Sequence, residues 1–391
     1  MKKIIISLLL LLAPTLVRAD ELSGLLKSVE KRNLELKGER EQMKAAGYEL
    51  KEQNTLDNTS IEYSPFFRKG AAGVASSELI VSQELDFPTL FAARGKAGKK
   101  QMEALEQKYR LDCRDILIQA TESYIELVKL TRVKKALEGQ LADAEKLDAL
   151  FTKKYNAGDA TSIELNRIKI QIMDLKRGLL ANESEIAGVR TTINNLNGYE
   201  DYPCGATEYP QWAFSDADLM PLDNDAEVKA AASEVESLRG EEKVAKQSWV
   251  PKLTLGYRRN TELDEASNGF VVGASFPLFS TSSKVKAAKA RKAAAEVEME
   301  NTRLKVASEI AATRNDLAIV SKSLGVYDVK LIDETERLLN KSVELGNLTI
   351  TDYYVELATL NERRMTYIEL EYEYYRGLCV LYKNTLIQNL K

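Results

Sequence analysis

The sequence predicts a mainly α-helical protein with a small β part, in which long antiparallel coiled-coil helical hairpins recur as an internal duplication. The chain has 391 residues with only 20 Gly and 8 Pro, and Ala, Leu, Lys, Arg and Glu dominate it, a composition typical of long helices. Beyond Pro14, the prolines leave two Pro-free stretches, 89–202 and 278–391. Each stretch follows a Phe-Pro pair and contains a Gly-centred break at a matching place, Gly158 and Gly346. The two halves therefore share one order of elements.

These markers predict the elements in chain order. The first repeat, 20–197, holds a helix, a β-hairpin at about 59–87, a long helix over 89–155, a tip at 156–161 and a helix over 161–197. A Pro-bearing linker or equatorial segment covers 198–223. The second repeat, 224–391, holds a helix, a β-hairpin at about 251–277, a long helix over 280–345, a tip at 346–349 and a helix over 350–390. Each long helix would be about 100 Å long, which matches two shorter helices stacked end to end.

Residues 1–19 have the pattern of a secretory signal peptide. Lys2 and Lys3 precede an apolar stretch over 4–12, and Val17-Arg18-Ala19 forms a small-residue cleavage site. The apolar run is too short to span a bilayer, so a retained anchor is the weaker interpretation. Because no later segment supplies 18 consecutive apolar residues, a membrane location would not depend on a transmembrane helix.

Composition and charge exclude several classes of function. The chain contains no His, which removes His-based acid–base chemistry and His metal sites, and 55 basic against 59 acidic residues leave no basic footprint for nucleic acid. The three Cys are widely separated, form no zinc or redox spacing, and are predicted to pack in the interior. No nucleophile–base pair, P-loop or dinucleotide fingerprint is present in the sequence. We therefore expect no enzymatic activity, cofactor or metal site.

Apolar residues recur at heptad spacing within the Pro-free stretches. One series recurs every seventh residue: Ile310, Leu317, Leu324, Leu331, Leu338 and Leu345. Such a period buries a seam against a partner helix. The last helix has two apolar stripes, rich in Tyr, so it is predicted to lie between two neighbours, and its Tyr residues are predicted to pack rather than bind a ligand. This favours a closed wall of helices over an isolated hairpin.

Both breaks have the same residue pattern, which predicts tight helix-turn-helix tips. A Gly past a helix end supports a left-handed C-cap, and a Thr followed three residues later by an acid resembles a capping box. The residues are Gly158, Thr161 and Glu164 at the first tip and Gly346, Thr349 and Asp352 at the second. Asp352 fits the capping box less well than Glu164.

Alternating apolar and polar residues indicate two short strands in each half. The apolar positions are Ile61, Tyr63 and Phe67, then Leu79, Val81, Leu85 and Phe87, then Leu253, Leu255 and Tyr257, and finally Phe270, Val272, Ala274 and Phe276. Alternation over about ten residues suits a strand that crosses an outer membrane. A small soluble sheet with one wet face explains the alternation equally well. Four strands cannot close a barrel, and lipid does not tolerate open sheet edges, so the membrane interpretation requires an oligomer.

The order of leader, paired β-hairpins, long helices and Gly-centred tips resembles the TolC-type outer-membrane efflux and secretion channels, the outer membrane factors. The most specific residues are those of the two tips, 155–164 and 345–352, and the Phe-Pro pairs at Pro88 and Pro277. The resemblance covers essentially the whole mature chain. It implies a homotrimer with a 12-stranded barrel in the bacterial outer membrane and an α-helical tunnel extending into the periplasm.

The resemblance also implies a function. Such proteins are passive exit ducts of tripartite efflux pumps or type I secretion systems and open at their periplasmic tip. They work with an inner-membrane transporter and a periplasmic adaptor, the membrane fusion protein. A periplasmic coiled-coil adaptor or a structural coiled-coil protein, both without a membrane barrel, is the alternative. An adaptor normally carries one long hairpin beside β-rich domains, whereas this sequence predicts two hairpins and four strands.

The resemblance further suggests the residues of the periplasmic entrance. Asp352 matches the first acid of a ring that narrows the entrance in the family, and Glu356 lies one turn along the same helix face. The second acid of the family pattern falls on Val355 and the tip Arg on Leu348, so the family's latching network is incomplete. Alternatively, Asp352 only caps a helix and Glu356 is solvated. An adaptor is expected to dock at the tips, at Gly158, Thr161, Glu164, Gly346 and Thr349.

Basic residues follow each Phe-Pro pair. They are Arg94, Lys96, Lys99 and Lys100 in the first half and Lys284, Lys286 and Lys289, followed by Arg291 and Lys292, in the second. We interpret them as a membrane-proximal basic collar that faces anionic lipid headgroups. A lumen lining for anionic cargo and an ordinary solvated face are the alternatives.

Overall fold

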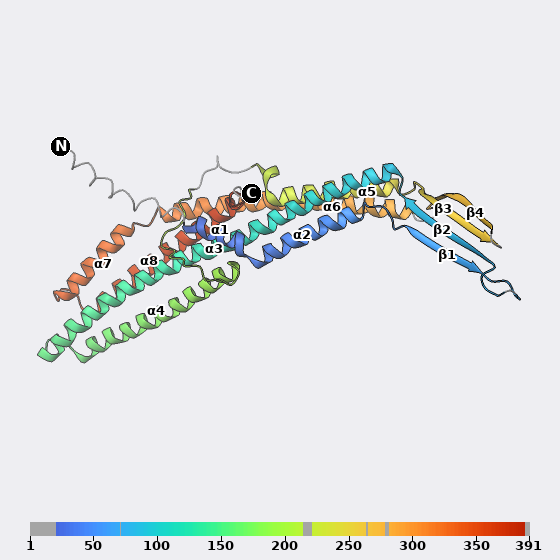
Figure 1. Ribbon diagram of the computed structural model, residues 1–391. Coiled ribbons are helices and arrows are strands. Elements are labelled where there is room, and N and C mark those ends of the chain that lie inside the picture. The colour runs from blue at the N-terminus through green and yellow to red at the C-terminus, as the bar shows by residue number, and fades with distance from the viewer. Residues whose placement is uncertain (1–20, 71, 214–220, 263–264, 278–280, 388–391) are drawn as a thin grey trace, which may run out of the picture. The chain divides into compact units, whose positions relative to one another are not determined.

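The computed structural model describes residues 21–70, 72–213, 221–262, 265–277 and 281–387. The predicted signal peptide lies outside these residues. In chain order the elements are α1 (Glu21–Arg32), α2 (Leu34–Glu52), β1 (Ser60–Phe66), β2 (Ser76–Leu85), α3 (Pro88–Ala157), α4 (Ser162–Leu196), α5 (Ala226–Gln247), β3 (Lys252–Glu262), β4 (Glu265–Ser275), α6 (Thr281–Leu324), α7 (Val329–Glu344) and α8 (Ile350–Leu381). Short 3-10 helices cover Leu222–Asn224 and Lys383–Thr385. The described chain is thus mainly helical with one small antiparallel sheet, which confirms the predicted fold class of the protomer (Figure 1).

The chain divides into two compact units, and each takes segments from both predicted repeats. The strand unit consists of Gly38–Leu111 and Pro221–Ala307 and contains the sheet. The tip unit consists of the described residues of Met1–Lys37, Asp112–Met220 and Ser308–Lys391 and contains both helical tips. The duplication therefore sets the order of elements along the chain, while each compact unit combines corresponding segments of the two repeats.

In the strand unit, the four strands form one antiparallel sheet in the order β1-β2-β3-β4 (Figure 1). Directly paired residues of antiparallel strands project to the same face of the sheet. The register pairs Val81 with Ile61 on one side and with Tyr257 on the other, and Tyr257 in turn pairs with Phe270. A single face therefore collects the predicted apolar positions that lie within the strands, and its polar residues are Ser77, Gln83, Arg259, Thr261 and Asn268.

The opposite face of the sheet is polar and carries ion pairs. Arg258 of β3 pairs with Glu78 of β2, and Lys252 lies 3.7 Å from Glu84 and 2.6 Å from Asp57. An apolar face and a charged face on strands of seven to eleven residues are the pattern of a sheet between lipid and water.

In the tip unit, α4 returns along the distal part of α3 after the first tip (Figure 1). α3 is continuous over 70 residues, from Pro88 to Ala157, and no Pro or left-handed residue interrupts it. Its part in the tip unit carries a dense series of buried apolar side chains, including Leu117, Ile125 and Val128. A helix of this length is stabilised by such tertiary packing more than by its own propensity.

The long helix predicted over 280–345 is wrong as a single element. α6 ends at Leu324, and α7 begins at Val329. Gly325 ends the first helix in a tightened turn, and Asp328 caps the second, because its carboxylate accepts a hydrogen bond from the Leu331 amide at 3.1 Å. The heptad series runs in phase through the break, so the apolar pattern did not reveal it.

Two further helix predictions need correction. The helix predicted over 350–390 ends at Leu381, and the chain then turns so that the buried Lys383 ammonium reaches Glu309 at 2.6 Å. The helix that precedes the first hairpin is divided at Asn33, whose side chain accepts a hydrogen bond from the Leu36 amide and donates one to the Leu196 carbonyl. Asn33 thus caps the start of α2 and ties it to the end of α4.

Among the described helices, none has a stretch both long and apolar enough to cross a bilayer.

Candidate functional site

The first tip is closed by two capping motifs in succession. Gly158 has a φ of +84°, its amide bonds the Tyr155 carbonyl at 3.1 Å, and the Asp159 amide bonds the Lys154 carbonyl at 2.8 Å. This pair of bonds is a Schellman motif, which satisfies the last carbonyls of α3. The sequence prediction of a left-handed C-cap at this glycine is confirmed.

A complete capping box starts α4 at the same tip. The Glu164 amide donates to the Thr161 hydroxyl at 3.2 Å, and the Glu164 carboxylate accepts from the Thr161 amide at 2.8 Å. These bonds favour the ionised carboxylate, so the backbone hydrogen bond from Thr161 lowers the pKa of Glu164 below its ordinary value of 4.5.

The second tip repeats the first with one difference. Gly346 has a φ of +77°, and the amides of Gly346 and Asn347 bond the carbonyls of Val343 and Ser342 at 3.2 and 2.9 Å. The Asp352 amide donates to the Thr349 hydroxyl at 3.1 Å, and that hydroxyl donates to the Asp352 carboxylate at 2.7 Å. The shorter Asp side chain does not reach back to the Thr349 amide, so this helix start has half of a capping box.

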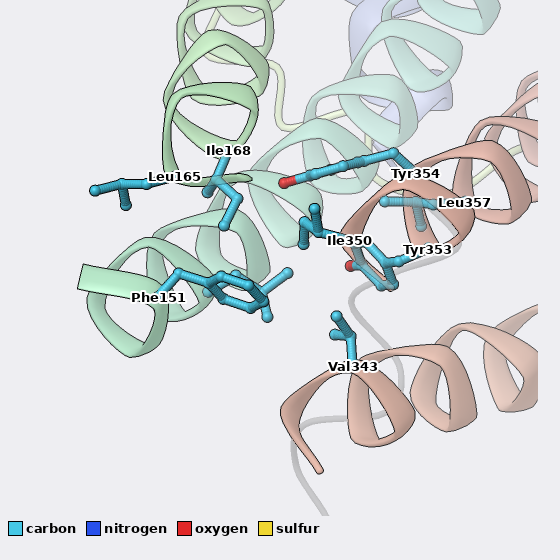
Figure 2. Close-up of a cluster of buried hydrophobic side chains, with 9 residues drawn as sticks. Phe151, Leu165, Ile168, Val343, Ile350, Tyr353, Tyr354 and Leu357 are labelled. Carbon is cyan, nitrogen blue, oxygen red and sulfur yellow. The ribbon is translucent and has the colours of Figure 1, made fainter. Parts of the chain in front are cut away.

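A shared apolar core joins the two tips. It combines Leu147 and Phe151 of α3, Leu165 and Ile168 of α4, Val343 of α7, and Ile350, Tyr353, Tyr354 and Leu357 of α8. Figure 2 shows Val343 pointing from α7 toward Tyr353, with Ile350 between the two hairpins. Tyr353 and Ile350 are almost fully buried, so the two tips pack as one body.

A chain of partly buried hydrogen bonds runs along this core. The Tyr353 hydroxyl donates to Asn340 Oδ1 at 2.6 Å, and Asn340 Nδ2 donates to Asp143 Oδ2 at 2.7 Å. The chain therefore links α8, α7 and α3. Burial raises the pKa of Tyr353, so the phenol remains a donor at physiological pH. The sequence predicted that the tyrosines of the last helix pack between helices, but it did not reveal the hydrogen bonds of Tyr353 to Asn340 and of Asn340 to Asp143, because nothing in the local pattern shows that these residues meet.

Tyr354 lies beside this chain. Burial raises its pKa to about 12, and the Arg167 guanidinium of α4 lies 5.9 Å from its ring. The same guanidinium lies 3.5 Å from the Thr351 hydroxyl, so α4 contacts the start of α8 through one cation.

The predicted entrance acids lie on the exposed face of α8. Asp352 and Glu356 are both exposed, together with Val355 between them, whereas Tyr353 and Leu357 point into the core. Asp352 is therefore a capping residue and an exposed carboxylate at once. The two acids share one face, as their spacing predicted.

The predicted basic collar is less uniform than the sequence suggested. Arg94 pairs with the buried Asp86 carboxylate just after β2, and Lys100 pairs with Glu103 at 2.6 Å, which raises the pKa of Lys100. Lys292 pairs with Glu242 at 3.2 Å. The remaining collar residues, Lys96, Lys99, Lys284, Lys286, Lys289 and Arg291, are exposed. Three of the nine cations are thus already neutralised by neighbouring carboxylates.

Within the described residues, no group of three or more Cys, Asp or Glu side chains could hold a metal ion. No disulfide joins the buried cysteines, and burial raises the pKa of the Cys204 and Cys379 thiols to about 12. These thiols are therefore protonated at neutral pH.

Comparisons with known proteins agree with the fold described above. Residues 220–384 match the family model described as outer membrane efflux protein. The match lies in the second half of the chain. The resemblance inferred from the sequence is thereby confirmed, and the matched segment contains the second tip and two of the four strands. No curated protein sequence matches the chain.

Solved structures of outer membrane proteins and channels have the same fold over almost the whole chain. A structure of CusC matches with a TM-score of 0.75 at 15% identity and covers 93% of this chain and 92% of that one. The outer membrane protein VceC of Vibrio cholerae matches with a TM-score of 0.73 at 16% identity, covering 93% and 95% of the two chains. The CmeC outer membrane channel of Campylobacter jejuni gives 0.73 at 15% identity, covering 93% and 85%.

Proposed function

We propose that three copies of this chain form a passive exit duct in the bacterial outer membrane, in a tripartite efflux pump or a type I secretion system. The observation that carries this proposal is the sheet with one apolar and one ion-paired face, attached to paired helical hairpins. The apolar face suits lipid, and the charged face suits a water-filled lumen. Such a duct catalyses no reaction. A periplasmic adaptor and an inner-membrane transporter supply cargo and energy.

Assembly follows from the strands at the edges of the sheet. β1 and β4 are its outer strands, and lipid does not satisfy the hydrogen-bonding groups of an open edge. Pairing β4 of one copy with β1 of the next repeats the contact until the ring closes. Three copies give twelve strands, which is within the range of single-chain outer-membrane barrels.

Exposed apolar seams on the helices support the same assembly. On α4 the exposed Ile163, Ile170 and Leu180 keep heptad positions, with exposed fractions of 79%, 55% and 68%. On α7, Leu331 and Leu338 follow the same period and are each 60% exposed. In a closed wall of helices, these seams pack against neighbouring copies.

The tips serve as the periplasmic entrance in this proposal. Asp352 and Glu356 of three copies would place six carboxylates around one constriction and attract cations. Gly158, Thr161, Glu164, Gly346 and Thr349 form the rigid turns on which an adaptor docks, and the exposed collar cations contact the periplasmic headgroup layer.

Native mass and membrane fraction test the proposed function together. Detergent-extracted protein from the outer-membrane fraction should have three times the protomer mass after correction for bound detergent. A monomer or dimer that needs no detergent would contradict the duct. Deleting the gene should also raise sensitivity to exported compounds or retain a secreted protein in the cell, and restoring the wild-type chain should reverse that effect.

A further inference from the structure

A groove between α2 and α3 in the strand unit combines an apolar floor with a cationic rim. Its volume is about 620 Å³, within the range of pockets that hold small molecules. Leu50 and Met102 contribute apolar surface to it, and Gly47, Gly95 and Gly98 keep it open. A Cβ added at Gly95 would lie 3.3 Å from the Asn54 amide nitrogen and would crowd that side chain.

The charges of this groove are all positive. Its charged residues are Lys44, Lys51, Arg94 and Lys99, and no carboxylate lines it. Lys44 pairs with Glu41, and Arg94 pairs with Asp86. Lys51 and Lys99 form no ion pair with any described residue, and the Lys51 ammonium lies 5.5 Å from the ring of the exposed Tyr48. Two cations are thus available to an anionic ligand.

An unsatisfied acceptor lies in the same groove. Asn54 Oδ1 is shielded from solvent and has no hydrogen-bond partner among the described residues. A buried acceptor without a donor is costly, so a ligand that brings a hydroxyl or N–H would satisfy it. The groove therefore fits a ligand with an anionic group for the lysines, a donor for Asn54 and some apolar surface.

The position of the groove along α3 matches a lipid headgroup layer. The exposed Phe87, Phe91, Trp249 and Phe276 lie next to the ends of the strands, where outer-membrane barrels place aromatic girdles. Gly95 and Gly98 follow Phe91 by about 6 and 10 Å along the helix. A headgroup layer adds about 5–8 Å on each side of the hydrocarbon core. The part of the groove at Gly95 therefore lies at the depth where lipid phosphates are expected.

We propose that this groove binds the headgroup of an anionic, hydroxyl-bearing phospholipid such as phosphatidylglycerol. The phosphate contacts Lys51 and Lys99, a glycerol hydroxyl donates to Asn54 Oδ1, and Leu50 and Met102 contact the apolar part of the lipid. The binding site fixes the depth of the tunnel below the membrane. The inference rests on the proposed outer-membrane location of the chain.

Native mass spectrometry of the detergent-extracted assembly tests the groove. Phosphatidylglycerol and phosphatidylethanolamine of matched chains are added separately, and the lipid retained per protomer is measured over a titration. K51Q/K99Q should weaken phosphatidylglycerol binding about thirtyfold, since two lysines near a membrane surface each contribute about a factor of five. K243Q/K305Q removes two exposed lysines of the same unit outside the groove and should bind as the wild type does.

Three results would overturn the lipid assignment. They are unchanged phosphatidylglycerol binding by K51Q/K99Q, equal retention of phosphatidylethanolamine by the wild type, and binding of soluble glycerol phosphate as tightly as the lipid. The membrane fraction and oligomer mass are recorded on the same preparations. A trimeric outer-membrane protein that retains no phosphatidylglycerol contradicts only the groove. A chain absent from the outer membrane contradicts the proposed function itself.

Discussion

The hydroxyl group of Tyr353 starts the hydrogen-bond chain that links the two helical tips. Its phenol is 1% exposed and donates to Asn340, which in turn donates to Asp143. Tyr353→Phe keeps the ring and leaves Asn340 Oδ1 without this donor, at a cost of about 1–2 kcal/mol. Amide hydrogen exchange in α7 and α8 near the tips should therefore accelerate about tenfold.

A matched control uses another tyrosine of the same unit. Tyr155 lies at the end of α3 and is 46% exposed, so Tyr155→Phe should leave exchange unchanged. Equal protection in both variants would show that the hydrogen-bond chain does not stabilise the tips.

Alanine substitutions at Gly346 and Gly188 distinguish the effect of backbone conformation from the effect of side-chain packing. A Cβ at either position meets no atom within 4 Å, but only Gly346 has a positive φ, +77°. Gly346→Ala should destabilise the second tip by about 1–2 kcal/mol. Gly188→Ala, inside α4, should stabilise its helix by up to about 1 kcal/mol.

Thermal melting of the two glycine variants provides the measurement. Export by cells that carry Gly346→Ala should fall, while normally expressed Gly188→Ala should export as the wild type does. Opposite signs of the melting shift are expected, and a stabilised Gly346→Ala variant would refute the left-handed cap.

For single residues, the sequence reveals those whose structural role depends only on their neighbours along the chain. Gly158 and Gly346 are recognisable because a glycine at a helix end has a conformational reason to be there, and Thr161 with Glu164 is a contiguous capping pattern. Asn340 was not recognisable, because its partners come from two other helices. The sequence suggested that Arg94 is an unpaired cation, because its partner Asp86 lies outside the helix, just after β2.

Among the elements, the start of α4 should depend on pH through Glu164. The pKa of Glu164 is lowered in the folded protein, so its stabilising contribution is full above the ordinary value of 4.5 and is lost as pH falls through the folded value. Melting temperatures of the wild type and Glu164→Gln should therefore differ at pH 6 and converge as the pH falls through the lowered pKa of Glu164. A constant difference over that range would exclude the carboxylate as the cause.

The exposed seam of α4 makes a prediction about assembly. Ile170 is 55% exposed at a heptad position, so Ile170→Asp would bury a charge wherever the seam packs against another copy. The detergent-extracted protein should shift from trimer to monomer on native mass measurement. Lys169→Asp changes the charge of the adjacent exposed residue more strongly but lies off the seam, so it should remain trimeric. An intact Ile170→Asp trimer would assign this face to solvent.

The spacing of apolar residues predicted the elements well where a pattern ended at a Gly or a Pro. Alternation predicts which residues of each strand share a face, and the observed register places Val81, Tyr257 and Phe270 on one face. Alternation alone does not fix the register, because a shift of two residues leaves the faces unchanged. The interruption after Leu324 was hidden because Leu331 falls one heptad later, as it would in a continuous helix. Helix breaks that preserve phase are not detectable from apolar spacing alone.

For the whole assembly, the entrance acids predict ion selectivity. In a trimer, Asp352→Asn/Glu356→Gln removes six negative charges from the proposed constriction while keeping side-chain size. Cation over anion permeability in planar bilayers should fall toward unity at low salt, where screening is weak. Glu362→Gln/Glu373→Gln removes the same charge from exposed positions farther along α8 and should leave selectivity unchanged. Equal selectivity of all three proteins would place the constriction elsewhere.

The pairing of β2 with β3 has a consequence for biogenesis. These neighbours in the sheet are separated in the chain by α3, α4 and α5. The edge of β2 that pairs with β3 therefore stays unpaired until the second half of the chain has emerged. Contacts so distant in sequence form slowly, and an unpaired edge promotes aggregation. The sheet is therefore completed late in folding, after both hairpins have been made.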